Sequence, residues 1–187
     1  FGPRILGVTS LAVQPGAPEV MLIASADGVI RSVNGGGSWR KTTGWQVADV
    51  RSLAFDRAQP GRVYAATLWG PIRSDDGGAT WALAQTGLTE LYSQTVVADR
   101  DRSGRVILGT AAGVYVSTDA ALTWRRVPSP STTILRLAQS EVDPRLVIAG
   151  SQHRGAWLSR DAGETWTATD PVTAQANLYA VALHRRE

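Results

Sequence analysis

The sequence has no cysteine, one methionine, one lysine and two histidines in 187 residues. The absence of cysteine excludes disulfides and thiolate metal sites. The two histidines, His153 and His184, lack the spacing of a zinc-binding pair. No apolar run approaches the ~20 residues that span a bilayer. We therefore expect no metal, no cofactor and no membrane span.

The excess of positive over negative charge is also small. Basic residues exceed acidic residues by 19 to 16, and all the basic residues except Lys41 are arginine. The formal net charge of +3 is small and scattered, which argues against nucleic-acid binding. An apolar content of 43% is enough for a globular core. The chain begins at Phe1 without an initiator methionine, so we interpret it as a processed mature protein or an excised segment.

An eight-residue pattern occurs four times, at residues 32–39, 74–81, 117–124 and 159–166. Each copy begins with serine, has Asp or Asn at its third position and ends with tryptophan. The intervals between successive tryptophans are 42, 43 and 42 residues, a period typical of propellers and solenoids. The serine, acceptor and tryptophan positions are Ser32, Asn34, Trp39, Ser74, Asp76, Trp81, Ser117, Asp119, Trp124, Ser159, Asp161 and Trp166.

The rest of each unit repeats as well. A glycine stands four residues before each motif serine, and two short runs rich in Val, Ile and Tyr precede it, bounded by Gly, Pro and Asp. Such runs predict strands, and we expect four per unit. In the first unit the predicted strands are 7–13, 20–25, 28–32 and 39–42. No segment has a convincing helical period.

Four short antiparallel strands in each unit predict a blade of an all-β propeller. The predicted blades are 5–46, 47–88, 89–130 and 131–172, and residues 177–184 match the first strand of each unit, which predicts the opening strand of a fifth. An open array of units is the alternative. Four blades make a tight ring, so we expect part of a six- to eight-bladed ring, or self-association that completes the ring.

The motif itself indicates a turn between the third and fourth strands. Asp or Asn at the third position can accept hydrogen bonds from the backbone ahead, glycine permits positive φ, and tryptophan can pack under the loop. One carboxylate per copy is too few for a calcium site, so we favour a structural role over a calcium or sugar site. Ala120 and Ala121 replace glycine in the third copy, which costs about 1 kcal/mol or more if φ is positive there.

The pattern S-x-D-x-G-x-x-W resembles the Asp-box, or BNR repeat, of sialidases, two-propeller xyloglucanases, sortilin-like receptors and photosystem II assembly factors. The resemblance implies a β-propeller whose boxes lie at the rim away from the ligand-binding face. The order of strands in a meander places all four boxes at one end of the blades as well. We therefore expect any binding site at the opposite end.

The loops at that opposite end supply the candidate ligand-binding residues. Trp45 and Trp69 lie outside the repeating pattern and could stack on a sugar or anchor a partner, or could merely cover the blade ends. Asp27 and Glu90 could form an acid/base pair if they lay roughly 5 to 9 Å apart. The remaining candidates are Tyr92, His153 and Arg154.

Several arginines recur at equivalent positions. Arg31 and Arg73 share one position in successive units, which favours a solvated face of the third strand over a shared anion site. The pairs Arg40-Lys41 and Arg125-Arg126 follow the motif tryptophan on the outermost strand, where charge protects an exposed edge. Docking of an acidic partner is the alternative for these pairs.

These observations favour a non-catalytic recognition or assembly module that binds a protein or a glycan. We expect such a module to be extracytoplasmic, either secreted or periplasmic. A segment of a sialidase- or xyloglucanase-like glycoside hydrolase with an incomplete catalytic set is the alternative. The F-R-I-P signature of sialidases is absent, and residues 1–6 hold those letters in another order. The sequence leaves open whether the chain is an enzyme, and its motifs favour a non-catalytic protein.

Overall fold

The computed structural model describes residues 7–169 and 171–183. This part of the chain forms four separate four-stranded sheets and a single short 3-10 helix. Every sheet is an antiparallel meander, in which each strand pairs with the next strand along the chain. The predicted all-β fold with four-stranded blades is therefore confirmed.

The four blades follow the sequence repeat. The first contains β1 (Val8–Gln14), β2 (Ala17–Ser25), β3 (Gly28–Ser32) and β4 (Arg40–Lys41). The second contains β5 (Val50–Phe55), β6 (Val63–Thr67), β7 (Ile72–Ser74) and β8 (Ala82–Leu83). The third contains β9 (Ser93–Ala98), β10 (Val106–Thr110), β11 (Gly113–Ser117) and β12 (Arg125–Arg126). The fourth contains β13 (Ile134–Gln139), β14 (Val147–Ser151), β15 (Ala156–Ser159) and β16 (Thr167–Ala168), and η1 (Pro171–Thr173) follows it.

The outermost strand of each blade is only two residues long. We expected residues 39–42 to form the outer strand of the first blade, but the ladder holds only at β4. Both residues of each outer strand are exposed. Such a strand buries little apolar surface, so little free energy favours a longer ladder. The first strands also pair on one side only, but they contact the first strands of neighbouring blades and are longer.

The hydrophobic core lies between the blades. Three clusters of buried side chains fill the three interfaces, and each draws residues from the two blades that it joins. Burial is most complete in the two middle blades, where all five residues of each of β6, β10 and β11 are shielded from solvent. Representative members of the three clusters are Leu22 with Phe55, Tyr64 with Leu108, and Ile107 with Val147.

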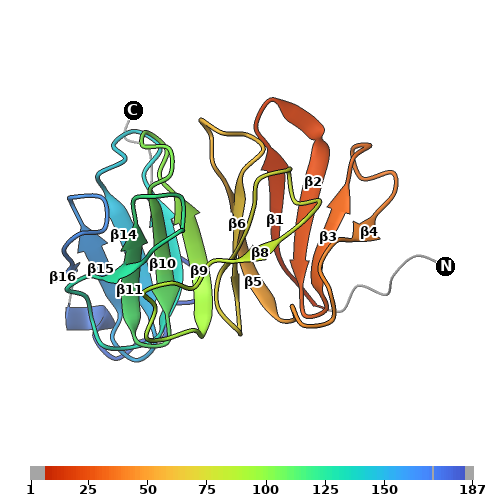
Figure 1. Ribbon diagram of the computed structural model, residues 1–187. Helices are drawn as coiled ribbons and strands as arrows, with labels where there is room; N and C mark the ends of the chain where they lie inside the picture. Colours follow the sequence, from red (N-terminus) through yellow and green to blue (C-terminus); the bar gives the residue numbers. More distant parts are fainter. Residues whose placement is uncertain (1–6, 170, 184–187) are drawn as a thin grey trace.

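The blades follow one another in chain order across Figure 1, with the first and fourth at opposite sides of the view. The first strands of neighbouring blades contact each other, β1 with β5, β5 with β9 and β9 with β13. Leu53 and Phe55 of β5 are buried against the first blade, at 8% and 9% exposure. Leu11 and Val13, their equivalents on β1, are 56% and 41% exposed. The chain thus forms part of a propeller, with an apolar flank uncovered at its first blade.

The predicted opening strand of a fifth blade, residues 177–184, lies partly beyond the described residues, because 184 is not among them. Over 174–183 the structure assigns no strand. Leu178 N donates to Ser151 O at 3.2 Å, which lays this segment beside the fourth blade. A first strand pairs with the second strand of its own blade, and the described part of the chain holds no such strand for it to pair with. The strand therefore stays a prediction.

The four motif copies share one end of the blades with the turns between first and second strands, as the meander predicts. In the second blade, Gly77 N donates to Gly61 O at 2.7 Å, so the motif turn rests on the turn between β5 and β6. In the other blades the backbone N–H groups of residues 35, 120 and 162 donate the equivalent bond. No helix in the described part of the chain combines the length and the apolar character needed to cross a membrane.

Candidate functional site

The box turns, defined as residues 32–39, 74–81, 117–124 and 159–166, are closed by hydrogen bonds within the turn. In the second blade, Asp76 Oδ1 accepts from Thr80 N at 2.8 Å and from Ala79 N at 2.9 Å. The hydroxyls of Ser74 and Thr80 donate to the same carboxylate at 2.7 and 2.6 Å. Burial of the carboxylate opposes ionisation, but these hydrogen bonds prevail and lower the pKa of Asp76 to about 2. Each acceptor is thus committed to its own turn.

The other box turns repeat this pattern with local variations. In the first, Asn34 replaces Asp; its Oδ1 accepts from Ser38 N at 2.8 Å, and its Nδ2 donates to Ser38 Oγ at 3.0 Å. In the third, Ala120 and Ala121 have φ of +62° and +63°, the left-handed conformation that glycine adopts in the second. The turn is therefore built from its hydrogen bonds even where its glycines are missing.

The opposite end of the blades carries a second repeated turn, between the second and third strands. In the second blade, Thr67 Oγ1 donates to Gly70 O at 2.6 Å and accepts from Trp69 N at 3.1 Å. Ser25 and Thr110 make the same pair of bonds in the first and third blades, and Ser151 makes the first of them in the fourth. We call these hydroxyl-framed turns. Sequence reasoning missed them, although a Ser or Thr three or four residues before the glycine was the available signal.

Each hydroxyl-framed turn presents a different side chain at the position before its glycine. This residue is Asp27 in the first blade, Trp69 in the second, Ala112 in the third and Arg154 in the fourth. The fourth turn is one residue longer, and His153 adopts a φ of +56° there. The first three turns thus share one frame, the fourth keeps the hydroxyl-to-carbonyl bond across a longer loop, and the displayed side chain differs in each.

Trp69 borders a groove of about 410 Å³ between the first two blades. Its side chain is 61% exposed, and its carbonyl accepts a hydrogen bond from Gln85 Nε2 at 2.6 Å. The link between β4 and β5 forms the facing wall, and Trp45, 85% exposed, lies in that link. Trp69 and Trp81 thus line the groove, whereas Trp45 lies in the adjoining link without lining it.

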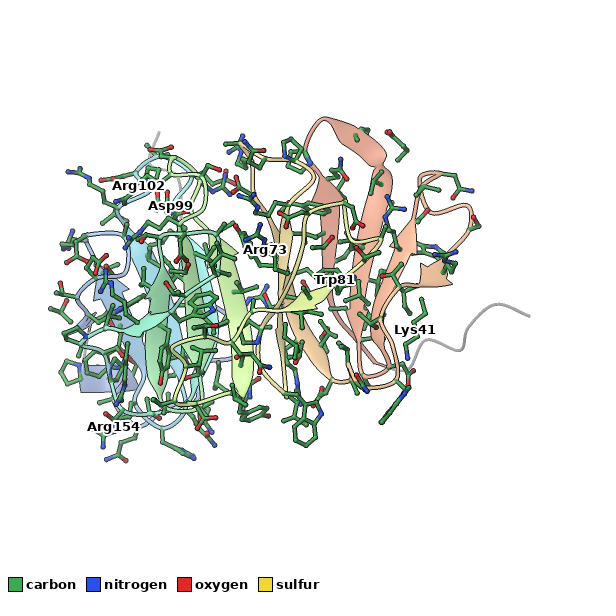
Figure 2. All side chains as sticks on the ribbon, in the orientation of Figure 1. Lys41, Arg73, Trp81, Asp99, Arg102 and Arg154 are labelled. Carbon is green, nitrogen blue, oxygen red and sulfur yellow. The ribbon has the colours of Figure 1, made fainter. Side chains whose placement is uncertain are left out.

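The other candidates lie at separate turns. Glu90 Oε1 accepts from Tyr92 N at 2.8 Å, so this carboxylate holds its own loop. His153 N donates to Asn177 Oδ1 at 2.7 Å. Arg154 borders a different groove, of about 360 Å³, beside Trp157, whose Nε1 donates to Arg154 O at 2.9 Å. Figure 2 shows Arg154 at the lower end of the blades, opposite Asp99 and Arg102 at the box end.

The structure does not bring these candidates into a single site. Asp27 and Glu90 belong to different blades, and neither carboxylate lines the grooves beside Trp69 or Arg154. Within residues 7–169 and 171–183, no three carboxylate or imidazole side chains come together in a way that could hold a metal ion. The chemistry at this end is therefore that of a contact surface with aromatic, basic and acidic positions.

Arg31 and Arg73 do not lie on a solvated face, so that interpretation was wrong. Arg31 Nε donates to Gly77 O in the box turn of the second blade, and Arg73 Nη1 donates to Ala120 O in that of the third, both at 2.8 Å. Arg105, from the turn before β10, makes the equivalent 2.8 Å bond to Ala162 O in the fourth. The residue spacing could not reveal that these side chains reach the next blade.

Four meander blades with box turns at one end define a β-propeller of the Asp-box type. The Sortilin-Vps10 family model, described as "Sortilin, neurotensin receptor 3", matches residues 71–182. Because this match covers more than half of the chain, the protein belongs to the Sortilin-Vps10 family. No curated protein matches the chain.

Solved structures support the same fold. The chain is similar to an ancestral GH74 enzyme (TM-score 0.75, 21% identity, covering 88% of this chain and 24% of that chain). It is similar to the GH74 xyloglucanase from Xanthomonas campestris, with a TM-score of 0.72 and 16% identity over 90% of this chain and 31% of that chain. It is also similar to YCF48 bound to a D1 peptide, with a TM-score of 0.70 and 15% identity over 92% of this chain and 57% of that chain. The chain thus spans between a quarter and rather more than half of these structures. Enzymes and a peptide-bound protein share this fold.

Proposed function

We propose that this propeller segment is a recognition module that binds a protein partner at the end of the blades opposite the box turns. The observation that carries the proposal is the set of hydroxyl-framed turns, which keep the same hydroxyl-to-carbonyl hydrogen bond while the displayed residue changes from Asp27 to Trp69 to Arg154. A surface of this kind gains specificity from its side chains at little cost to the fold.

The exposed tryptophans support a protein partner. Trp45 and Trp69 are 85% and 61% exposed, and large aromatic side chains dominate the binding free energy of protein interfaces. The groove beside Trp69 offers an apolar wall made by Val47, Trp81 and Leu83. The similarity to YCF48, solved with a D1 peptide, is a fold-level precedent for peptide binding. The carboxylate of Glu90, committed to Tyr92 N, is poorly placed to serve as an acid or base in a hydrolase.

The experiment is a selection of peptides from a random display library on the immobilised chain. The selected peptides are then measured on Trp45→Ala/Trp69→Ala and on Leu122→Ala, a matched control whose side chain is 62% exposed in a box turn. We expect at least tenfold weaker binding to the double variant and unchanged binding to the control. Peptides that bind all three proteins equally would contradict the proposal. Hydrolysis of a xyloglucan oligosaccharide or a fluorogenic sialoside that Glu90→Gln abolishes would favour the hydrolase alternative.

The uncovered flank of the first blade supports a second contact. Leu11 and Val13 stand where a preceding blade would pack, and exposed apolar side chains in such a row favour association. We include in the proposal that further propeller blades, or a second copy of this chain, cover this flank.

A further inference from the structure

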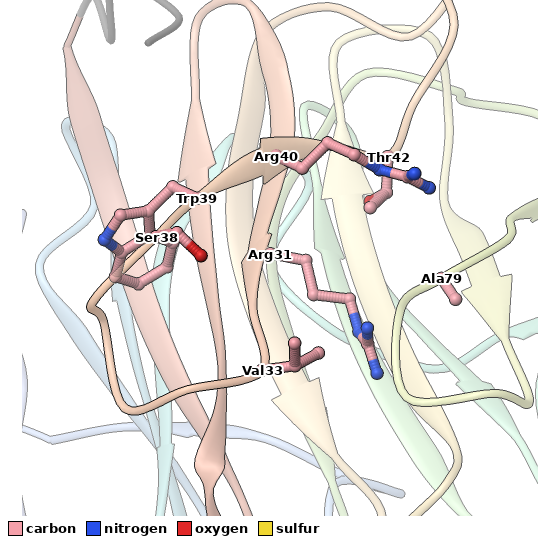
Figure 3. A pocket seen from close by; sticks show the side chains of 7 residues that line it. All are labelled: Arg31, Val33, Ser38, Trp39, Arg40, Thr42 and Ala79. Carbon is pink, nitrogen blue, oxygen red and sulfur yellow. The ribbon is translucent and has the colours of Figure 1, made fainter.

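A cavity of about 320 Å³ opens between the box turns of the first two blades. Figure 3 shows two arginine side chains directed across it from adjacent strands, with a tryptophan and a serine on one side. Its lining residues are Arg31, Val33, Ser38, Trp39, Arg40, Thr42 and Ala79.

The two arginines of this cavity carry unneutralised charge. Arg31 on β3 and Arg40 on β4 are cross-strand partners, and like charges directly opposite each other destabilise a sheet. Arg31 Nε donates to Gly77 O, which leaves its terminal nitrogens for another acceptor. Among the residues that the structure describes, neither arginine forms an ion pair.

The interface between the third and fourth blades shows how the equivalent charge is balanced there. Arg125 occupies the position of Arg40, because both face the penultimate residue of the third strand in their blades. Arg125 Nη2 pairs with Glu164, the sixth residue of the fourth box turn, at 2.6 Å. The sixth residue of the second box turn, which faces Arg40, is Ala79.

The interface between the second and third blades uses another carboxylate. Arg73 occupies the position of Arg31 and pairs at 2.7 Å with Asp75, the second residue of its own box turn. In the first box turn the second residue is Val33. Both positions that supply a carboxylate elsewhere in the molecule are thus apolar here, and both line the cavity.

We propose that the Arg31–Arg40 cavity binds a carboxylate side chain from an acidic peptide of a partner protein. The guanidinium groups provide the planar donors that suit a carboxylate, and the hydroxyls of Ser38 and Thr42 add polar groups to the lining. The internal precedent is a glutamate on a neighbouring protein loop, Glu164, which is why the occupant is a peptide. The outer edge of β4 is unpaired within the described residues, so an extended segment can lie along it.

The first test is an NMR titration of the arginine Nε–H signals with a capped hexapeptide of alternating glutamate and threonine. The matched probe has glutamine in place of glutamate. We expect saturable shifts of Arg31 and Arg40 with the glutamate peptide, loss of these shifts in Arg40→Gln, and weakening at 0.5 M salt. Equal shifts with the glutamine peptide would overturn the proposal. Tighter binding of inorganic phosphate than of the glutamate peptide would also overturn it, in favour of a general anion site.

The second test supplies the carboxylate within the chain. In Ala79→Glu the new side chain should occupy the cavity as Glu164 does at its own interface, so the melting temperature should rise and glutamate-peptide affinity should fall at least tenfold. Ala79→Gln should change neither the melting temperature nor the peptide affinity.

The matched control is Leu122→Glu, which places a carboxylate at the sixth position of the third box turn. At that interface Ala82 stands at the position that Arg40 occupies in the first blade. Val33→Asp, which copies the position of Asp75, is the second variant if Ala79→Glu does not fold. Undiminished peptide binding in both carboxylate variants would contradict the proposal.

The Arg31–Arg40 cavity shares Thr42 with the groove at the proposed recognition end, but neither Trp45 nor Trp69 lines the cavity. Trp45→Ala/Trp69→Ala should leave the arginine shifts unchanged, so the two proposals stand or fall independently.

Discussion

Arg105 of the third blade donates a hydrogen bond to Glu164 of the fourth at 2.6 Å. The arginine side chain is 7% exposed and the glutamate 33%, so this pair is partly withdrawn from solvent. Arg125 reaches the same carboxylate from the outer strand, also at 2.6 Å. Burial opposes ionisation of Glu164, but the two arginines prevail and lower its pKa. The box end of this interface is thus joined by charge as well as by apolar packing.

Replacing Glu164 by glutamine should destabilise the protein, because the buried Arg105 would lose the nearer of its two carboxylate partners and keep only Asp99, whose Oδ2 lies 3.6 Å from Arg105 Nε. We expect a loss of about 1–3 kcal/mol in the free energy of unfolding, measured with urea. The control is Glu141→Gln, since Glu141 is 68% exposed in its pair with Arg100. That variant should lose less than about 1 kcal/mol. Equal effects of the two substitutions would contradict a special role for the Arg105–Glu164 pair.

The box carboxylates should make stability fall in acid. The pKa of Asp76 is about 2, below its ordinary value, and the pKa values of Asp119 and Asp161 are lowered by the same kind of turn hydrogen bonds, against the opposing effect of burial. Because the folded-state pKa lies below that of the unfolded chain, the contribution is complete above about pH 5 and is lost as the pH falls toward 2. Urea unfolding between pH 7 and pH 3 measures it.

Asp76→Asn is the variant that isolates this effect. Asn34 already fills the same position in the first box turn with an amide that accepts and donates. We expect Asp76→Asn to be less stable than the wild type at pH 7, to approach the wild type as the pH falls toward 2, and so to show a shallower decline in acid. An unchanged slope would show that Asp76 does not contribute to the acid sensitivity.

The third box turn should tolerate, and gain from, a glycine. Ala120 has a φ of +62°, so Ala120→Gly should stabilise the protein by about 0.5–1 kcal/mol, because relief of the left-handed strain exceeds the added entropy of the unfolded chain. The converse substitution is Gly77→Ala at the equivalent position of the second turn, where φ is +69° and a Cβ would meet Gln14 Oε1 at 2.7 Å. It should destabilise. Thermal melts of both variants test the pair.

The uncovered flank should govern self-association. Leu11→Asp/Val13→Asp places two charges among side chains that are 56% and 41% exposed, so it should cost the isolated chain little stability. We expect the wild type to associate with rising concentration in sedimentation velocity and the variant to remain a monomer. A wild type that stays monomeric throughout would contradict association through this flank.

The repeated tryptophans were sufficient to predict the blades. A period that brings Trp39, Trp81, Trp124 and Trp166 to the same place in each unit is a property of the chain alone, and so are the apolar runs that become strands. The lengths of the outer strands were not predictable in this way, because β4 and its equivalents are limited by how little surface they bury in the folded protein rather than by residue type.

The contacts between blades were beyond prediction from spacing. In the sequence Arg31 and Arg73 are ordinary polar residues of an alternating strand. In the structure each donates a hydrogen bond, 2.8 Å long, to a backbone carbonyl of the next blade. The candidates at the opposite end illustrate the same limit. From the sequence Glu90 was a plausible catalytic group, but in the structure its carboxylate accepts a hydrogen bond from Tyr92 N. In both cases the decisive partner lies in backbone whose position depends on the whole fold.

The arginine-to-carbonyl bonds all run in one direction, from a blade to the box turn of the blade that follows it. The middle units therefore carry both halves of the joint, a forward-reaching guanidinium and a receiving turn. A tandem duplication of such a unit would create a new blade already equipped to join its neighbours on both sides. Growth of the propeller by gene duplication then requires no new interface.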